Sequence, residues 1–186
     1  MQIKRFLLVA AVLATTACED PFASLDWDPA PVQLMLFSAS RPEYVGRLSA
    51  FDLAGVPPRA VAIETEAGAG TWDVLLIDSE GGLALAPPAI FPGVESEAGV
   101  AVILNRPFDD VVEAPSGDEA YSLTPVMLRL DAVYVLRSRP VRCSTNTGPV
   151  YAKIRPVAIN VAEGSFTFDY VENPNCGDRD LVPAED

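Results

Sequence analysis

The sequence contains no histidine among its 186 residues. This absence excludes a Ser-His-Asp triad, a Cys-His catalytic pair and a histidine metal site. Lysine is also scarce, because Lys4 and Lys153 are the only two in the chain. Carboxylate or Ser/Lys chemistry stays open in principle, but no pair of carboxylates has a recognisable catalytic pattern. We therefore predict that the protein is not an enzyme and bears no metal site.

Long apolar runs are absent except at the start of the chain. Lys4 and Arg5 precede an uninterrupted apolar stretch, 6–14, and the small residues 15–17 lead directly to Cys18. This order is typical of a bacterial export signal. The apolar stretch is too short to cross a bilayer as a helix.

The position of Cys18 predicts a lipoprotein. We expect residues 1–17 to be the signal peptide and Cys18 to carry the lipid, such as palmitate, that anchors the protein in the bacterial envelope, on the periplasmic or cell-surface face. The match has one departure, since Thr15 stands where such signals usually have leucine. The alternative is an ordinary secretory signal cut after Ala17, which would leave Cys18 as a free thiol in an oxidising compartment.

Basic residues are few. The chain has 13 basic and 26 acidic residues, and loss of 1–17 removes two of the basic ones, so the mature charge is −15. Such a chain is repelled by nucleic acid and by anionic headgroups. We therefore expect no nucleic-acid partner. The acidity serves either solubility or an acidic recognition surface.

Only three cysteines are present. Apart from Cys18, the chain has Cys143 and Cys176, which can form a disulfide that encloses 32 residues. Such a bridge would stabilise the fold by about 3–4 kcal/mol in the chain-entropy account. The alternative for this pair is a zinc or catalytic role, although two isolated cysteines without histidine are atypical of either.

The mature chain is long enough for one domain with a core of its own. Residues 18–31 are rich in proline and acidic side chains and indicate a tether, in which Trp27 is a candidate for packing on the domain. Residues 32–186 form the expected domain.

The pattern beyond the tether is typical of an all-β protein. Phe166, Phe168 and Tyr170 alternate with polar residues, which indicates a half-buried strand. With the strand before it and Gly164 in the turn, this strand predicts a long hairpin over 149–171, interrupted by Pro156 at an edge or bulge. Further strands are expected at Val32–Phe37, Gly46–Leu53, Ala60–Glu64, Trp72–Ile77, Gly82–Ala86, Val100–Leu104, Val126–Leu130 and Ala132–Arg137. Asp109–Ala114 is the one candidate for a short helical turn.

Several segments, taken in order, resemble the HmuY family of envelope haem-binding lipoproteins. They are Phe51–Gly55, Thr71–Val74, Phe108–Pro115 closing with Tyr121, Val133–Arg137, Val150–Ile154 and Gly164–Tyr170. The resemblance covers residues 46–175. It implies a two-sheet HmuY-like β domain around one core. It also implies haem capture, often through two histidines, which this chain cannot provide.

Methionine is the remaining haem-ligand type suggested by the resemblance. Met35 lies in an alternating apolar strand, so we expect it to fill the core. Met127 is expected at the core or its boundary. Met127 and Tyr121 are the candidates for a cofactor or ligand site, with Tyr44 as a further pocket-lining side chain. No cofactor is predicted, and haem is the only one that the resemblance suggests.

The resemblance also assigns structural roles. Trp72 is expected in the core, and Asp73 is expected to accept hydrogen bonds from nearby backbone groups. Phe108 and Tyr121 are expected to pin a loop across the sheet. Lys153 is expected as a solvated strand residue with a packed stem. Asp109 and Asp110 are expected in a solvated turn, with a calcium site as the alternative.

Three functions are consistent with the sequence. The first is an envelope lipoprotein that binds a small ligand in an apolar groove without catalysis. The second is an interaction module that contacts another envelope protein through an exposed patch or sheet edge. The third, a carboxylate-based hydrolase, requires two carboxylates about 5–10 Å apart across a cleft.

Overall fold

A computed structural model describes residues 26–65, 68, 70–143 and 147–183. This part of the chain is almost entirely β, with two five-stranded antiparallel sheets, a small two-stranded ribbon and three one-turn 3-10 helices, η1 (Pro42–Tyr44), η2 (Pro88–Ile90) and η3 (Asp118–Ala120). The predicted all-β class is confirmed. In the described residues no helix has the length and apolar character needed to cross a membrane.

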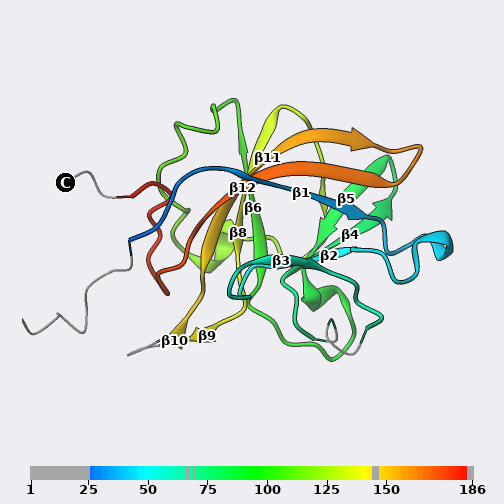
Figure 1. The fold of residues 1–186 in the computed structure, drawn as a ribbon, viewed down its shortest axis with the longest axis horizontal. Helices are drawn as coiled ribbons and strands as arrows, with labels where there is room; N and C mark the ends of the chain where they lie inside the picture. The colour runs from blue at the N-terminus through cyan, green and yellow to red at the C-terminus, as the bar shows by residue number, and fades with distance from the viewer. Residues whose placement is uncertain (1–25, 66–67, 69, 144–146, 184–186) are drawn as a thin grey trace, which may run out of the picture.

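The first sheet contains the long hairpin. Its strand order is β1 (Val32–Phe37), β12 (Ser165–Asn173), β11 (Tyr151–Asn160), β8 (Ala132–Arg137) and β6 (Gly99–Leu104). In Figure 1, β1, β12 and β11 run side by side across the molecule. The register of β11 against β12 shifts between Pro156 and Ala158, as expected for a strand that contains a proline without an N–H donor.

The second sheet is built from shorter strands. Its order is β3 (Arg59–Val61), β2 (Ala50–Asp52), β4 (Val74–Ser79), β5 (Gly82–Ala86) and β7 (Val126–Met127). The strands expected at 46–53, 60–64, 72–77 and 126–130 are therefore displaced or shortened. Their bounds follow hydrogen bonds that lie outside the regular ladders: the Phe37 N–H of β1 donates to the Leu48 carbonyl before β2, and the Ser49 N–H donates to the Val61 carbonyl of β3 in the same sheet.

The main core fills the space between the two sheets. Alternate residues of the longer strands point into it, such as Phe166, Phe168 and Tyr170 of β12, as the period of two requires. Its largest fully buried members include Tyr134, Phe51, Phe166, Phe168 and Leu76. The Phe51 ring contacts the Phe168 ring edge-on, with centroids 5.8 Å apart. This packing joins β2 of one sheet to β12 of the other.

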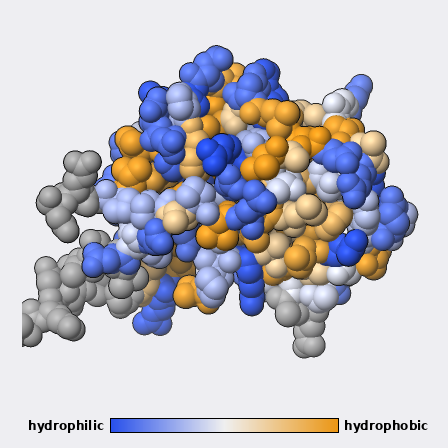
Figure 2. Space-filling model, turned by 45° about the horizontal axis from the view of Figure 1, so that its top comes forward, coloured by the Kyte–Doolittle hydropathy of each residue, from blue (hydrophilic) through white to orange (hydrophobic). Residues whose placement is uncertain are grey.

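Each sheet also has a covered outer face. On the first sheet, Phe108, Val111 and Tyr121 of the 105–121 segment pack on a cluster that includes Val135 and Tyr151. On the second sheet, Trp72 packs with residues of β2, β3, β4 and β5. The molecule is thus a two-sheet sandwich with loops folded over both outer faces. Figure 2 shows hydrophobic patches among hydrophilic ones on the face that it presents.

The far tip of the β11–β12 hairpin is held by one arginine. Arg41 donates two hydrogen bonds to the Asp78 carboxylate and one each to the carbonyls of Val161 and Ala162. The Tyr44 hydroxyl donates to the Glu163 carbonyl next to them. Gly164, at φ +70°, gives the tip its close approach to Arg41.

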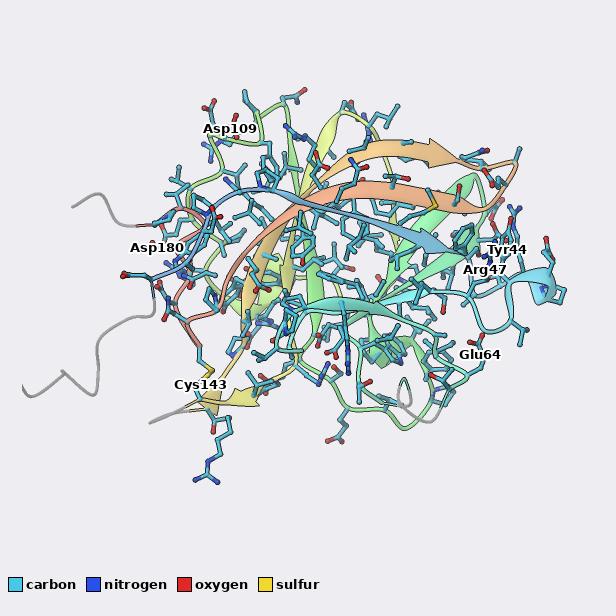
Figure 3. The ribbon with its side chains drawn as sticks, in the orientation of Figure 1. Tyr44, Arg47, Glu64, Asp109, Cys143 and Asp180 are labelled. Atoms are coloured by element: carbon cyan, nitrogen blue, oxygen red, sulfur yellow. A yellow bond between two sulfur atoms is a disulfide. The ribbon has the colours of Figure 1, made fainter. Side chains whose placement is uncertain are left out.

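The base of the same hairpin is closed by a disulfide between Cys143 and Cys176, whose Cα atoms are 6.2 Å apart. This confirms the pairing of these two cysteines. The ribbon of β9 (Val141–Arg142) and β10 (Thr147–Gly148) lies beside it. Figure 3 shows Cys143 and Tyr44 at opposite ends of the long axis, so the hairpin is fastened at both ends. Cys18 lies outside the described residues.

Three expectations were wrong, two about single residues and one about a short segment. Met35 is 46% exposed, because Leu34 and Leu36 are the residues of β1 that pack on the main core and Met35 lies on the opposite face. Lys153 is 3% exposed rather than solvated, because the 105–121 segment covers the face on which it lies. Asp109–Ala114 forms a turn without a helix, and Glu113 instead makes an isolated bridge with Asp180.

Candidate functional site

A groove of about 870 Å³ opens beside the outer face of the second sheet. Four separate parts of the chain form it: the residues before β4, the segment that connects β5 to β6, a single residue of the segment that leads to β7, and the residues after β8. The lining residues are Gly70, Trp72, Pro88, Ala89, Phe91, Val94, Glu95, Ser96, Glu97, Leu123, Arg139 and Pro140.

One part of the groove lining is aromatic. Trp72 is fixed in the outer cluster of the second sheet and is 9% exposed, whereas Phe91 is 42% exposed. Their ring centroids are 6.0 Å apart in an edge-on arrangement, which is a favourable geometry for aromatic pairs. Trp72 therefore supports Phe91, and Phe91 offers ring surface to a bound molecule.

Apolar side chains continue this surface. Val94 and Leu123 are 44% and 42% exposed, so both leave apolar surface in contact with water. The short helix η2, with two prolines before Ala89, sets the path of the segment that carries Phe91 and Val94. Exposed apolar surface gathered in a concave site is typical of ligand-binding sites.

Buried aspartates hold one charged residue of the groove lining in place. Arg139, 28% exposed, donates to Asp52 at 2.8 Å and lies 3.1 Å from a carboxylate oxygen of Asp73. Both aspartates are almost fully buried. Asp73 also accepts hydrogen bonds from the backbone N–H groups of Ala54 and Arg139. The predicted role of Asp73 as an acceptor for backbone donors is therefore confirmed.

Burial is the main influence on Asp73. It raises the pKa of this carboxyl above its usual range, although the hydrogen bonds and the charge of Arg139 act in the opposite direction. With its oxygens occupied by Ala54 and Arg139, Asp73 serves to hold the chain after β8 against β2 and β4. This arrangement positions Arg139 and Pro140 at the groove.

Two further carboxylates remain free at the rim. Glu95 and Glu97 both line the groove and are exposed. Within the described chain, neither carboxylate forms an ion pair or a side-chain hydrogen bond. Arg139, the basic residue of the groove, forms its ion pairs with Asp52 and Asp73 instead. The groove therefore presents uncompensated negative charge next to the Phe91 ring.

The residues that the sequence suggested for a ligand site lie outside the groove. Tyr121 is 4% exposed in the outer cluster of the first sheet, where its hydroxyl donates to the Pro115 carbonyl and Arg137 stacks on its ring at 4.7 Å. Burial raises the pKa of its hydroxyl. Met127, 36% exposed, lies on the edge strand β7. Neither residue lines the groove, and Tyr44 holds the hairpin tip.

Lys153 performs a structural task as well. Its ammonium group donates to the carbonyls of Phe108 and Val111 at 3.2 and 3.0 Å and lies 4.7 Å from the Phe108 ring centroid. Burial lowers its pKa. Lys153 thus fastens the 105–121 segment, the loop that Phe108 and Tyr121 were expected to pin. Within the described residues no group of three or more acidic or cysteine side chains is placed to hold a metal ion.

Phe91, Val94, Glu95, Glu97 and Arg139 were missed as site residues from the sequence. The only local signal, for the first four of these, is that the proline-rich 87–98 segment carries a large aromatic residue outside any strand pattern. Comparison with known proteins adds no family: no family model matches the chain, and no curated protein matches it.

Proposed function

We propose that this protein is a lipid-anchored, non-enzymatic protein of the bacterial envelope that binds a small ligand in the groove beside the second sheet. The observation that carries the proposal is the gathering of Phe91, Val94 and Leu123 on a groove of about 870 Å³. This volume is in the range of small-molecule sites, and such apolar surface is costly to leave in water without a use.

The attachment of the tether supports this arrangement. Trp27, at the end of the tether, packs on the outer cluster of the first sheet. The groove borders the outer face of the second sheet, since Trp72 belongs to the cluster on that face. A lipid on Cys18 would therefore hold the domain by one face and leave the groove on the other.

The charges near the groove favour binding over catalysis. Asp52 and Asp73, the buried carboxylates, are both engaged by Arg139. Glu95 and Glu97 lie two residues apart on one extended segment and not on opposite walls of a cleft. A hydrolase of the carboxylate type needs one carboxyl on each side of the scissile bond.

The groove also bears on the resemblance to haem-binding lipoproteins. The part of its lining that the structure describes includes no methionine, tyrosine or cysteine, and the chain has no histidine. We therefore keep the HmuY-like relationship as a proposal about the fold and propose a ligand other than haem.

The test is a binding screen on the purified full chain in a neutral detergent. Amide and indole NMR signals would be followed while a library of small molecules of varied charge is added. The blocking variant is Leu123→Trp, which fills the groove from an exposed position. Leu130→Trp is the matched control, because Leu130 is 65% exposed and does not line the groove.

The proposal predicts hits that shift the Trp72 and 94–97 signals, and that are lost in Leu123→Trp but kept in Leu130→Trp. If no compound shifts these signals, or if the hits are indifferent to Leu123→Trp, the groove is not the functional site. Hits on the exposed Met127 and Val161 would instead favour the alternative of an interaction module for another envelope protein. Both of these side chains lie within 4 Å of the Cβ position built on Gly82.

A further inference from the structure

We infer that the groove selects a cationic ligand with an apolar body, such as a quaternary ammonium or alkylated amine, held between the Phe91 ring and the carboxylates of Glu95 and Glu97. This inference rests on the proposed function and assigns its ligand class. It comes from the charge and shape of the groove alone.

The first step is the balance of charge at the groove. Among the described residues, its charged lining consists of two glutamates and one arginine. The arginine contributes little attraction for an anion, because Asp52 and Asp73 lie 2.8 and 3.1 Å from its guanidinium nitrogens. The charge that a ligand meets is therefore that of Glu95 and Glu97, and it is negative.

The second step is the aromatic surface. Phe91 is 42% exposed, and its ring packs in an edge-on pair with the ring of Trp72, which is 9% exposed. A cation over an aromatic face is attracted by the ring quadrupole, and aromatic sites in proteins use this attraction to recognise quaternary ammonium ligands. An ordinary hydrated ammonium ion would gain less, because Val94, Leu123 and Pro140 offer it only apolar contact.

The third step is the long-range field. The whole chain carries a formal charge of −13, so it attracts cations from a distance and repels anions such as carboxylates and phosphates. The local and the global charge thus act in the same direction. A neutral apolar ligand would use the ring surface but would leave both glutamates without a counter-charge.

Three probes of nearly identical shape separate these cases. Choline, 3,3-dimethylbutan-1-ol and 3,3-dimethylbutanoate share a compact group of three methyls and differ in carrying a positive, no or a negative charge. Each would be titrated into the full chain in a neutral detergent, with NMR shifts of Trp72 and residues 94–97 as the readout.

We expect choline to bind at least about tenfold more tightly than the alcohol, from one cation–π contact and two nearby carboxylates. The preference should shrink with added salt, because the glutamates are exposed. The double variant Glu95→Gln, Glu97→Gln should lose most of the preference.

The matched control is Glu64→Gln, Glu80→Gln, which changes the net charge equally at two exposed positions that do not line the groove. It should keep the preference. Phe91→Leu should weaken choline binding by about fivefold and leave the folded spectrum unchanged.

The outcomes distinguish this inference from the proposed function. If the alcohol or the anion shifts the same signals as strongly as choline, the cationic class is wrong while the groove stands as a binding site. If the control pair abolishes the preference as fully as the groove pair, general charge and not the groove selects the cation. If none of the three probes shifts the groove signals, the inference fails, and the broader library screen then decides the proposed function by itself.

Discussion

The carboxyl group of Glu172 has a strongly raised pKa. One of its oxygens is buried without a hydrogen-bond partner among the described residues, and burial raises its pKa from 4.5 to about 7. It lies on β12, opposite Ala152 and on the same face as Tyr170, two residues of the main core.

The raised pKa makes stability depend on pH. The folded state holds the proton more tightly than the unfolded chain, so this contribution is complete below pH 4.5 and is lost as the pH rises through about 7. Glu172→Gln should flatten that decline. Above pH 7.5 it should raise the free energy of unfolding by about 1–2 kcal/mol, a value reduced for partial exposure.

Urea unfolding at several pH values measures this effect. Glu80→Gln is the control, because Glu80 is exposed in the turn between β4 and β5. A variant at 172 with the same pH slope as the wild type would show that Glu172 is not the responsible group.

Two single residues show what could and what could not be expected from the sequence. The role of Asp73 as an acceptor was expected from the resemblance, but its donors could not be named, because the N–H groups of Ala54 and Arg139 lie 19 and 66 residues away in the chain. The burial of Lys153 was not expected, because strand alternation says which face a residue occupies but not whether a distant loop covers that face. The 105–121 segment decides this, and it is 32 or more residues away in the chain.

Gly164 controls the tip of the β11–β12 hairpin. A Cβ at this position would lie 2.5 Å from Arg41 Nε, and its φ of +70° disfavours other residues. Gly164→Ala should therefore displace Arg41 from Asp78 and the two tip carbonyls. We expect a loss of about 2–3 kcal/mol in the free energy of unfolding, from backbone strain and broken hydrogen bonds together.

Gly81→Ala separates the two causes. Gly81 has φ +95° but open space around its Cβ position, so this variant carries the strain alone and should lose about 1 kcal/mol. Equal losses for the two variants in denaturant unfolding would mean that the Arg41 contacts add nothing.

The disulfide between Cys143 and Cys176 fastens the other end of the hairpin across 33 positions of sequence. The double variant Cys143→Ala, Cys176→Ala should lower the free energy of unfolding by about 3–4 kcal/mol in the chain-entropy account. Reductant should destabilise the wild type by a similar amount and leave the double variant unchanged. A wild type indifferent to reductant would contradict this account.

Among the strands, the alternation of apolar and polar residues predicted those that follow a regular period of two. The hairpin, its bulge at Pro156 and the strands of the first sheet follow from a strict period of two. The short strands β2, β3 and β7 were placed less well. Their ends depend on hydrogen bonds between separate segments, such as the Phe37 N–H to the Leu48 carbonyl and the Leu128 N–H to the Leu83 carbonyl, which no local pattern encodes.

The whole molecule is proposed to act at a membrane. Cys18→Ser should remove the lipid and move the protein from the membrane pellet to the soluble fraction after cell fractionation. Labelling with palmitate should be lost in the same variant. The pair Cys143→Ala, Cys176→Ala is the control and should keep the label; an unlabelled wild type would favour the ordinary secretory signal.

The groove could not be predicted, although the fold class could. Its lining joins residues 70–72, 88–97, 123 and 139–140, which only the folded sandwich brings together. Each segment alone has the composition of an ordinary surface loop. The sequence directs attention to aromatic and methionine residues in strands, whereas the groove is made by the loops around the second sheet.

The most direct test of the groove as a ligand site is native mass spectrometry of the protein isolated from its own envelope in a mild neutral detergent. The account predicts a small bound molecule on the wild type and on Leu130→Trp, and its absence on Leu123→Trp. The same bound mass on all three proteins, or on none of them, would contradict the claim that this groove holds the physiological ligand.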